Sequence, residues 1–477
     1  MNITCPYIKK CGACSTIGRP YGGTLNAKEQ TVSHFIGKYV KPDKILGMKE
    51  PYHYRNKVHA VFGKDRYNNL VTGTYGERSH DLVPVAGCLI ENERADKIIE
   101  TVCSLANEFR LKAYDEDRQT GFLRHILVRT CHTTGEIMLV LVTADFMFPG
   151  KKNFAKELKK RLPGVTTFLI NVNKDRTNMI LGRPKDTEVV YGKGKVTDIL
   201  CGKRFIIGPD TFYQVNSEQT ERLYNMAIEL AELTGKEKVL DAYCGIGTIG
   251  IIASDKAGTV TGVELNNESV LNAKENARIN ACKNIEFISG DAGLELTKRV
   301  SGGDKKPFDV IFMDPPRAGA SEEFLASAIA AEPDKIIYVS CNPETLGRDL
   351  GILTKAGYKA EKAVPVDMFP WTDSVETVVL LSKGEVDSKK IRVEFSLEDM
   401  DMSEFQDGAT YPQIKAYVLE HSGLKVSNLY ISQIKRKCGI EVGKNYNLPK
   451  SEDSRQPQCP PEKEKAIREA FKYFGMI

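Results

Sequence analysis

The sequence predicts an α/β fold: a Rossmann-like domain at residues 208–384, an α+β domain before it at residues 1–207, and a linker with a small helical extension at residues 385–477. A length of 477 residues suggests two to four domains, at roughly 100–200 residues each. From residue 238 to 383, strand patterns alternate with helical ones, which is typical of a parallel sheet covered by helices. A charged stretch at 384–396, without apolar periodicity, then separates the last segment.

Charge is unevenly distributed along the chain. Residues 1–200 carry 32 Lys and Arg against 21 Asp and Glu, whereas residues 201–400 carry 23 against 32. A basic block joined to an acidic block indicates one part that binds a polyanion and another part with a different task. The alternative is that surface charge differs between the domains without a functional reason.

Composition and the N-terminus exclude several classes of protein. With 41% apolar and 27% charged residues, the chain is neither disordered nor a membrane protein. No stretch approaches the ~20 apolar residues of a bilayer span. The N-terminus lacks the apolar region of a signal peptide, so we expect a cytoplasmic protein whose 12 cysteines are not paired in disulfides.

The first domain is rich in strand patterns between residues 54 and 145. Residues 54–63 alternate polar and apolar side chains, and residues 121–130 and 135–144 predict two strands joined by a short turn. Residues 93–109 have helical periodicity. We therefore expect an α+β arrangement here.

The second domain begins with an amphipathic helix at residues 217–233. Helices such as 266–280 then alternate with strands predicted at 238–243, 259–264, 285–291, 308–314, 335–341 and 376–383. Because ligands bind outside the carboxyl ends of such strands, the side chains at those ends are the candidates for a functional site.

A glycine-rich turn, Gly245–Gly250, follows the first of these strands. It is typical of a nucleotide-cofactor site, because glycines let the backbone approach the ligand and the next helix offers its N-terminus. Glu264 ends the second strand, where a carboxylate can accept hydrogen bonds from both ribose hydroxyls, and Asp314 ends the fourth. Asp291 ends the third, where a helix N-cap explains it equally well. NAD and S-adenosylmethionine both satisfy this pattern.

Two further motifs, DPPR (Asp314–Arg317) and SCNP (Ser340–Pro343), favour methyl transfer over hydride transfer. A thiol beside a methyl donor suits a pyrimidine, because a thiolate that adds to carbon 6 makes carbon 5 nucleophilic. A base must later remove the proton from carbon 5. Cys341 is the candidate nucleophile, and Glu376, at the start of the final strand, is the candidate base. Taken singly, they would be interpreted as an inert buried cysteine and an ordinary edge-strand acid.

These motifs, with FYQVN (Phe212–Asn216) and the terminal Val375–Glu376, resemble the RNA (uracil-5-)-methyltransferases, and most of all their bacterial 23S ribosomal RNA branch. The resemblance implies a class I methyltransferase domain that methylates carbon 5 of uridine in 23S rRNA. It implies Cys341 as nucleophile, Glu376 as proton acceptor, and contacts to S-adenosylmethionine from Gln214, Tyr243, Glu264, Asp291 and Asp314.

The partner expected from this resemblance is RNA, with no DNA and no membrane. The sequence does not determine the oligomeric state, for which a monomer is the expectation. Two alternatives stay open: the same chemistry on a tRNA uridine, and a non-catalytic iron–sulfur protein that binds RNA.

Three cysteines lie close together near the N-terminus and a fourth follows later: Cys5, Cys11, Cys14 and Cys88. Their spacing alone leaves zinc and iron–sulfur open, since both accept four thiolates. The resemblance implies a [4Fe-4S] cluster on these four residues, and hence an iron–sulfur domain at residues 1–207.

The resemblance also places YRNK (Tyr54–Lys57) near the RNA path. The family often has histidines in the loop before the terminal acid, where this chain has Trp371 and Ser374. We therefore expect no proton relay assisted by histidine.

The C-terminal extension predicts helices at residues 411–423, 427–439 and 463–474. The second carries Lys435, Arg436 and Lys437, so the first two could form a relative of the helix-turn-helix. Residues 401–477 carry 12 basic and 10 acidic residues, so a small helical interaction module is the alternative.

Overall fold

The computed structural model describes residues 5–77, 79, 81–175, 179–304, 306–384, 411–422, 424–438, 440 and 459–473. The chain divides into two compact units, Met1–Val386 and Asp387–Ile477. The predicted linker, from residue 385 onward, lies outside the described residues.

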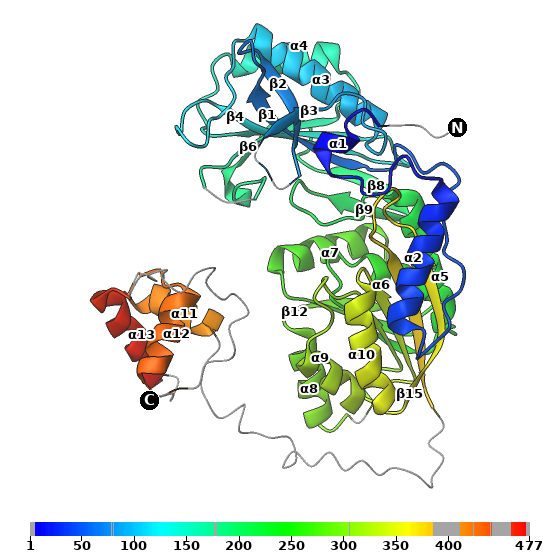
Figure 1. Ribbon diagram of the computed structural model, residues 1–477. Coiled ribbons are helices and arrows are strands. Elements are labelled where there is room, and N and C mark those ends of the chain that lie inside the picture. The colour runs from blue at the N-terminus through cyan, green and yellow to red at the C-terminus, as the bar shows by residue number, and fades with distance from the viewer. Residues whose placement is uncertain are drawn as a thin grey trace. The chain divides into compact units, whose positions relative to one another are not determined.

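The first unit contains two seven-stranded sheets (Figure 1). One has the order β3-β2-β1-β4-β5-β6-β7. Its strands are β1 (Lys57–Lys64), β2 (Leu70–Tyr75), β3 (Leu82–Pro84), β4 (Leu123–Thr130), β5 (Ile137–Thr143), β6 (Thr167–Val172) and β7 (Thr187–Tyr191), with a short 3-10 turn η1 (Pro184–Asp186) before β7. β4 and β5 pair antiparallel, which confirms the predicted strand pair. Helices α3 (Glu93–Glu108), which was predicted, and α4 (Lys151–Arg161) pack on one face.

The second sheet has the order β12-β11-β10-β13-β14-β16-β15. Its strands are β10 (Lys238–Ala242), β11 (Thr259–Glu264), β12 (Ile285–Ser289), β13 (Val310–Met313), β14 (Lys335–Ser340), β15 (Tyr358–Val366) and β16 (Glu376–Lys383). The first five strands in this order are parallel, as predicted. β16 instead runs antiparallel to β14 and β15, which corrects the expectation of a wholly parallel sheet. The segment between β15 and β16 contains no crossover helix, which a parallel connection requires.

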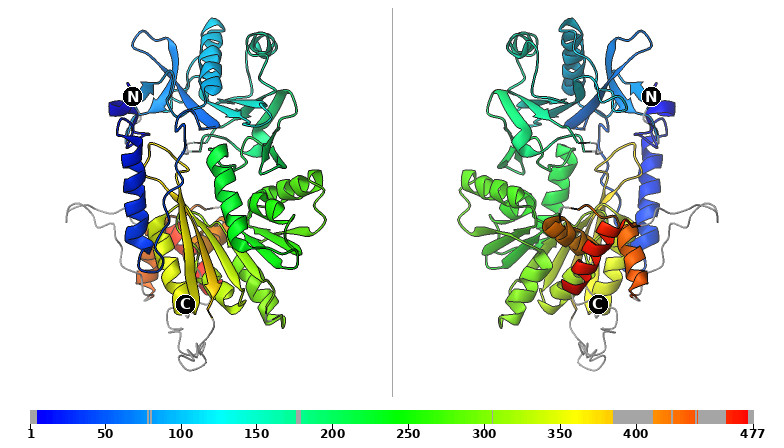
Figure 2. Two further views of the ribbon diagram at one scale, coloured as in Figure 1. Left: turned by 90° about the vertical axis from the view of Figure 1, so that its right-hand side faces the viewer. Right: turned by 90° about the vertical axis from the view of Figure 1, so that its left-hand side faces the viewer.

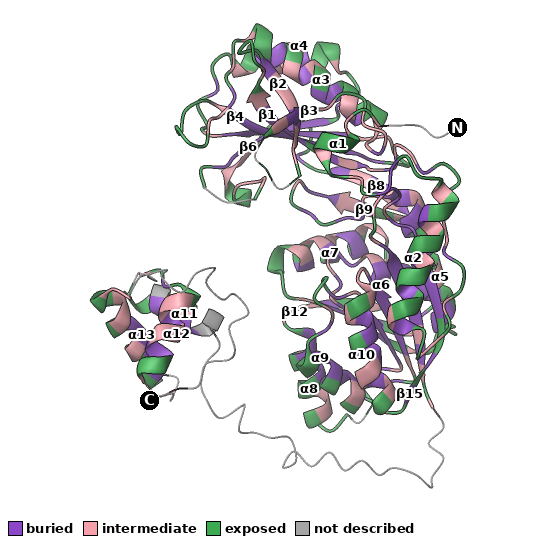
Figure 3. Cartoon of the chain, in the orientation of Figure 1, coloured by how far each residue is buried: buried purple, intermediate pink, exposed green. Residues whose placement is uncertain are grey.

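Alternate side chains of the second sheet build a core on each of its faces, and Figure 3 shows these strands buried. Helices α5 (Ser217–Ala231), α6 (Thr248–Ala253) and α7 (Asn267–Ile279) pack on one face. Helices α8 (Ala292–Ser301), α9 (Glu322–Ala330) and α10 (Pro343–Lys355) pack on the other. The predicted covering of the sheet by helices on both faces is therefore confirmed.

Helix α2 (Tyr21–Ile36) packs with the second sheet although it lies near the start of the chain. Its buried Val32 and Ile36 join the core that contains Leu346 and Leu350 of α10. Figure 2 shows α2, in blue, beside the yellow strands. The hairpin of β8 (Val196–Leu200) and β9 (Lys203–Ile207) shares a core with α5 and with one face of the first sheet. The boundary expected at residue 207 thus separates two sheets within one compact unit.

The second unit contains helices α11 (Tyr411–Ser422), α12 (Asn428–Lys437) and α13 (Pro461–Tyr473). They share an apolar core that includes Ile414, Ile431, Ile467 and Phe471. In the part of the chain that the structure describes, no helix is long and apolar enough to cross a membrane.

Candidate active site

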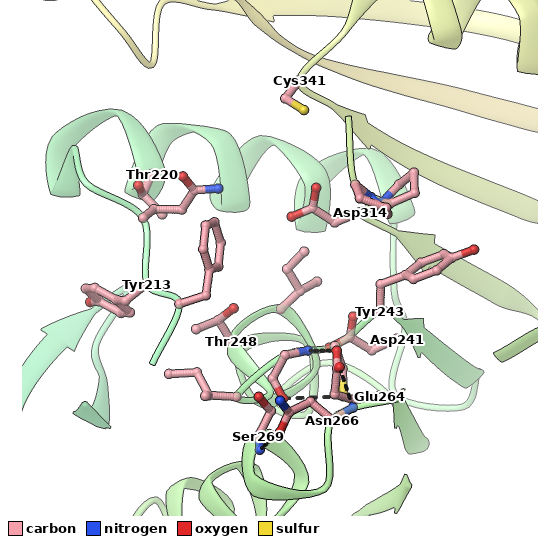
Figure 4. A pocket seen from close by; sticks show the side chains of 18 of the residues that line it. Tyr213, Thr220, Asp241, Tyr243, Thr248, Glu264, Asn266, Ser269, Asp314 and Cys341 are labelled. Atoms are coloured by element: carbon pink, nitrogen blue, oxygen red, sulfur yellow. Dashed lines mark hydrogen bonds between the residues drawn. The ribbon is translucent and has the colours of Figure 1, made fainter. Parts of the chain in front are cut away.

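A cavity of about 990 Å³ opens where β10, β11, β13 and β14 end (Figure 4). Small-molecule sites span roughly 300–1,000 Å³, so this cavity lies at the upper end of that range. Figure 4 shows Cys341 and Asp314 toward one end and Glu264, Asn266 and Ser269 toward the other. The structure brings every residue predicted for the cofactor and for catalysis to this wall: Gln214, Tyr243, Glu264, Asp291, Asp314, Cys341 and Glu376.

The glycine-rich turn after β10 leaves the cavity wall open. Tyr243, Gly245 and Gly247 have positive φ angles of 62°, 53° and 80°. A Cβ atom on Gly245 would meet no protein atom within 4 Å, whereas one on Gly247 would lie 2.6 Å from the ring of Phe287. Glycine at position 245 therefore keeps space free for a ligand, and glycine at position 247 permits core packing.

Carboxylates fix the backbone around this turn. Glu264 accepts a hydrogen bond from the N–H of Gly245 at 3.1 Å with one oxygen, and from the N–H of Asn266 at 2.8 Å with the other. Asp291 accepts a hydrogen bond of 3.0 Å from the N–H of Leu294 and caps α8. The N-cap interpretation of Asp291 is confirmed, and its contact with a cofactor stays a prediction.

Cys341 and Glu376 come together because of the strand order. β14 and β16 are antiparallel, and Ser340 lies opposite Thr377 in their register. The next position on each strand, Cys341 after β14 and Glu376 at the start of β16, therefore lies at the same end of the sheet. Glu376 is only 3% exposed, and both residues line the cavity. A thiol and a carboxyl group from distant parts of the sequence are thus neighbours.

The surroundings of Cys341 and Glu376 disfavour the charged form of both side chains. Burial, and after it the nearby Asp314, raise the pKa of Glu376 to about 8, while Arg317 opposes the shift. Burial likewise raises the pKa of the Cys341 thiol to about 11, with Glu376 and Asp314 acting in the same direction and Arg317 against it. Burial raises the pKa of Asp314 to about 7. Strongly shifted groups that share one cleft are typical of a catalytic site.

Helix α10 holds the segment that carries Arg317. Asn342 caps this helix, and its Nδ2 donates a hydrogen bond of 3.1 Å to the carbonyl of Arg317. The hydroxyl of Thr345 donates to the same carbonyl at 3.4 Å. The cation that favours the ionised forms of Cys341 and Glu376 thus extends from an anchored backbone.

The YRNK segment connects several walls of the cavity. Asn56 donates from Nδ2 to the carbonyl of Gln214 and to the hydroxyl of Ser217, both at 3.0 Å. The hydroxyl of Tyr54 donates to the carbonyl of Pro370 at 3.0 Å. Arg55 itself lines the cavity. The sequence singled out this motif but gave no individual role to Tyr54 or Asn56, because backbone carbonyls, which carry no sequence signal, accept most of their hydrogen bonds.

The four cysteines predicted to hold a metal group line one small cavity beside helix α1 (Ile8–Cys11), and its other walls are mostly apolar. Burial raises the pKa of Cys14 to about 11 and that of Cys88 to about 12, and the thiols of Cys11 and Cys5 add to the shift at Cys14. Within the described ranges, no group of three or more His, Cys, Asp or Glu residues is arranged to hold a metal ion. The structure gathers four thiols, and the metal group stays a prediction.

The strand order of the second sheet, with antiparallel β16 between β14 and β15, and the thiol beside the acids at its strand ends are those of a Rossmann-like methyltransferase. The chain matches the tRNA (uracil-5-)-methyltransferase family over residues 21–384, and it belongs to this family. It is therefore an RNA (uracil-5-)-methyltransferase.

Relatives and solved structures agree with this assignment. An RNA methyltransferase of Clostridium tetani is 43% identical over 382 residues, which cover 79% of this chain and 82% of that protein. One of Halalkalibacterium halodurans is 42% identical over 384 residues, with the same coverage. The structure is similar to that of the Pyrococcus abyssi tRNA (uracil-54, C5)-methyltransferase in complex with S-adenosyl-L-homocysteine. That likeness has a TM-score of 0.64 and 25% identity, and covers 76% of this chain and 84% of the other.

Proposed function

We propose that this enzyme methylates carbon 5 of a uridine in 23S rRNA with S-adenosylmethionine, through a covalent bond between Cys341 and carbon 6 of the uracil. The observation that carries the proposal is the juxtaposition of Cys341 and Glu376 across β14 and β16, at the wall of the large cavity. This chemistry requires a nucleophilic thiol and a base within reach of one ring. A ring of this kind reaches such a cavity when its nucleotide flips out of the stack.

The cavity wall fits S-adenosylmethionine. The open position at Gly245 is a cradle that a side chain would fill. The carboxylate of Glu264 is held by two backbone N–H groups and keeps lone pairs for ribose hydroxyls. Gln214, Tyr243, Asp291 and Asp314 line the same cavity and complete the proposed contacts. When bound, S-adenosylmethionine supplies the electrophilic methyl group that carbon 5 accepts, and S-adenosylhomocysteine remains.

The protein's own groups carry the remaining steps. The Cys341 thiolate adds to carbon 6, and the electron pair of the C5–C6 double bond moves toward carbon 5 and the carbonyl at carbon 4. After methylation, ionised Glu376 takes the proton from carbon 5. The electron pair left behind restores the double bond, and the bond between sulfur and carbon 6 breaks to release Cys341. Arg317 favours the thiolate that begins this sequence.

A uridine in tRNA is the second candidate substrate. The likeness to the Pyrococcus abyssi tRNA enzyme favours it. The four cysteines around one cavity favour 23S rRNA, since the resemblance to the 23S rRNA branch implies a cluster on these four residues.

Nucleoside mass spectrometry on unmodified rRNA and tRNA transcripts tests the proposal, with protein purified without oxygen. We expect 5-methyluridine in 23S rRNA with the wild type and none with Cys341→Ala. We expect Glu376→Gln to accumulate a denaturation-resistant protein–RNA adduct, because the thiol cannot leave until the proton does. Methylation of tRNA alone would show that tRNA, and not 23S rRNA, is the substrate. Methylation by Cys341→Ala would overturn the mechanism.

We also propose a [4Fe-4S] cluster on Cys5, Cys11, Cys14 and Cys88. Four thiols on one apolar-walled cavity suit a cluster, whose four thiolates stand further apart than the ligands of a single ion. Iron and acid-labile sulfide, measured on protein purified without oxygen, test this. Cys14→Ser should lose both, whereas Cys103→Ser, a half-buried cysteine outside this set, should keep them. Wild-type protein without sulfide would contradict the cluster.

A further inference from the structure

The segment at residues 367–375 joins β15 to Glu376 at the start of β16. Three of its residues, Phe369, Thr372 and Ser374, line the large cavity with Cys341 and Glu376. We call residues 367–375 the base loop. The base loop forms part of the cavity wall and leads directly into the strand that begins with the proposed proton acceptor.

Contacts from distant segments hold the start of the base loop. Buried Asp367 forms an ion pair with Lys28 of α2 and accepts a hydrogen bond of 2.6 Å from the hydroxyl of Tyr21. Asn216 donates from Nδ2 to the carbonyl of Met368 at 3.0 Å. This end of the loop is therefore fixed by side chains of α2 and of the FYQVN segment.

Trp371 holds the middle of the loop. Its Nε1 donates a hydrogen bond of 2.7 Å to the carbonyl of Pro51, and its ring stacks on that of Tyr52 at 5.3 Å. Its carbonyl accepts a hydrogen bond of 3.1 Å from the N–H of Thr16, two residues beyond Cys14. Its φ angle is 68°, a left-handed conformation that a non-glycine residue adopts only when its surroundings impose it.

The same tryptophan belongs to an apolar cluster against which three of the four cysteines pack. It is 4% exposed and shares one apolar cluster with Ile17 and with Cys5, Cys14 and Cys88. The base loop thus lines the proposed active site with one set of side chains, and through Trp371 it joins the apolar cluster on which Cys5, Cys14 and Cys88 pack. Packed interiors transmit displacement because they contain few voids.

We propose that Trp371 is a positioning residue that couples the four-cysteine site to the base loop, and this rests on the function proposed above. When the four-cysteine site is intact, its apolar cluster holds Trp371 and thereby the loop and Glu376. A change at the cysteines releases Trp371 and displaces the proton acceptor from the uracil ring.

Trp371 is the single tryptophan of the chain, so its fluorescence reports this coupling directly. Emission wavelength and acrylamide quenching are compared for wild type, Cys14→Ser and the control Cys103→Ser; intensity is left aside because a bound cluster would quench it. We expect a red shift and stronger quenching in Cys14→Ser alone, with a loss of kcat. Unchanged emission in folded Cys14→Ser, or shifted emission with unchanged kcat, would overturn the coupling.

A second pair of variants separates positioning from general packing. Trp371→Phe keeps an aromatic ring against Tyr52 but loses the donor to the carbonyl of Pro51. Tyr358→Phe is the control: it also loses one buried hydrogen bond to a backbone carbonyl, that of Pro333 at 3.0 Å, but outside the base loop. We expect Trp371→Phe to lower kcat and shift its pH midpoint at unchanged KM, and Tyr358→Phe to do neither. Equal effects of the two would overturn the positioning role, whereas a wild type that methylates no RNA would overturn the proposed function instead.

Discussion

The hydroxyl of Tyr338, in β14, donates a hydrogen bond of 2.6 Å to the buried carboxylate of Asp349, in α10. The same carboxylate accepts hydrogen bonds from the N–H of Ala320 at 2.9 Å and from Nε of Arg348 at 2.7 Å. Arg348 in turn donates to the carbonyl of Ala318 at 3.1 Å. Asp349 therefore fastens the segment after Asp314, which carries Arg317, to the sheet and to α10.

Replacing Asp349 should loosen this segment. We expect Asp349→Asn to lower the free energy of unfolding by about 1–3 kcal/mol, because an amide leaves buried donors without an acceptor. Chemical denaturation measures this, and initial rates should fall in parallel. Asp304→Asn, an exposed change, should do neither. Wild-type stability in Asp349→Asn would show that the three hydrogen bonds contribute nothing.

The pH dependence of methylation should follow Glu376 and Cys341. Both groups must lose a proton. Because the pKa of Glu376 is raised to about 8 and that of Cys341 to about 11, rates should increase as pH rises through about 8 and continue to increase above it. Arg317 lowers both pKa values, so Arg317→Gln should move the rise to higher pH. Initial rates between about pH 6.5 and 9.5 test this. The exposed Arg278→Gln should keep the wild-type profile, and a wild-type profile in Arg317→Gln would contradict the role given to its charge.

Ionisation of Glu376 should lower the free energy of unfolding, although it raises the rate of methylation. Its pKa in the folded protein is raised to about 8 from an ordinary value of 4.5, so the folded state binds the proton more tightly than the unfolded state. The stabilisation of the folded state by protonated Glu376 is fully present below about pH 4.5 and is lost as pH rises toward 8. We expect Glu376→Gln to exceed the wild type in unfolding free energy by more at pH 8.5 than at pH 6. Denaturant titrations at both values decide this, and a constant difference would contradict the raised pKa.

Glu264 should control affinity for the cofactor. Its carboxylate fixes Gly245 and Asn266 and is proposed to accept ribose hydroxyls. Hydrogen bonds to charged groups contribute about 1.5–3 kcal/mol, so Glu264→Gln should raise the Kd for S-adenosylhomocysteine about tenfold or more. Titration calorimetry measures this Kd. Glu268→Gln, exposed in the first turn of α7, is the control, and equal Kd values for the two variants would exclude the ribose contact.

The sequence predicted the elements whose apolar periodicity is local. β10, β11 and α7 lie within a few residues of their expected bounds. β15 was not predicted because Lys359, Glu361 and Lys362 interrupt the apolar pattern of this edge strand. α2 was not predicted because half of its buried face is polar: Thr24 and Lys28 accompany Val32 and Ile36. Burial of Lys28 depends on Asp367, which no local pattern reveals.

The sequence predicted which residues form the site better than it predicted how the fold brings them together. The acids and the glycine turn could be placed together because parallel strands end at one edge of a sheet. The proximity of Cys341 and Glu376 has a different cause, the antiparallel direction of β16, which the alternation of strands and helices did not indicate. The contacts of the base loop could not be predicted either, because the partners of Trp371 are backbone groups and side chains from a distant segment.

The ion pair between Lys28 and Asp367 has a consequence for synthesis of the chain. The two residues are 339 positions apart. At about 5–20 residues per second, α2 leaves the ribosome on the order of tens of seconds before Asp367 and α10 can meet it. During that interval Lys28 lacks Asp367, and Val32 and Ile36 lack the α10 residues of their core. The nascent chain therefore exposes a surface suited to molecular chaperones until α10 and Asp367 have been synthesised.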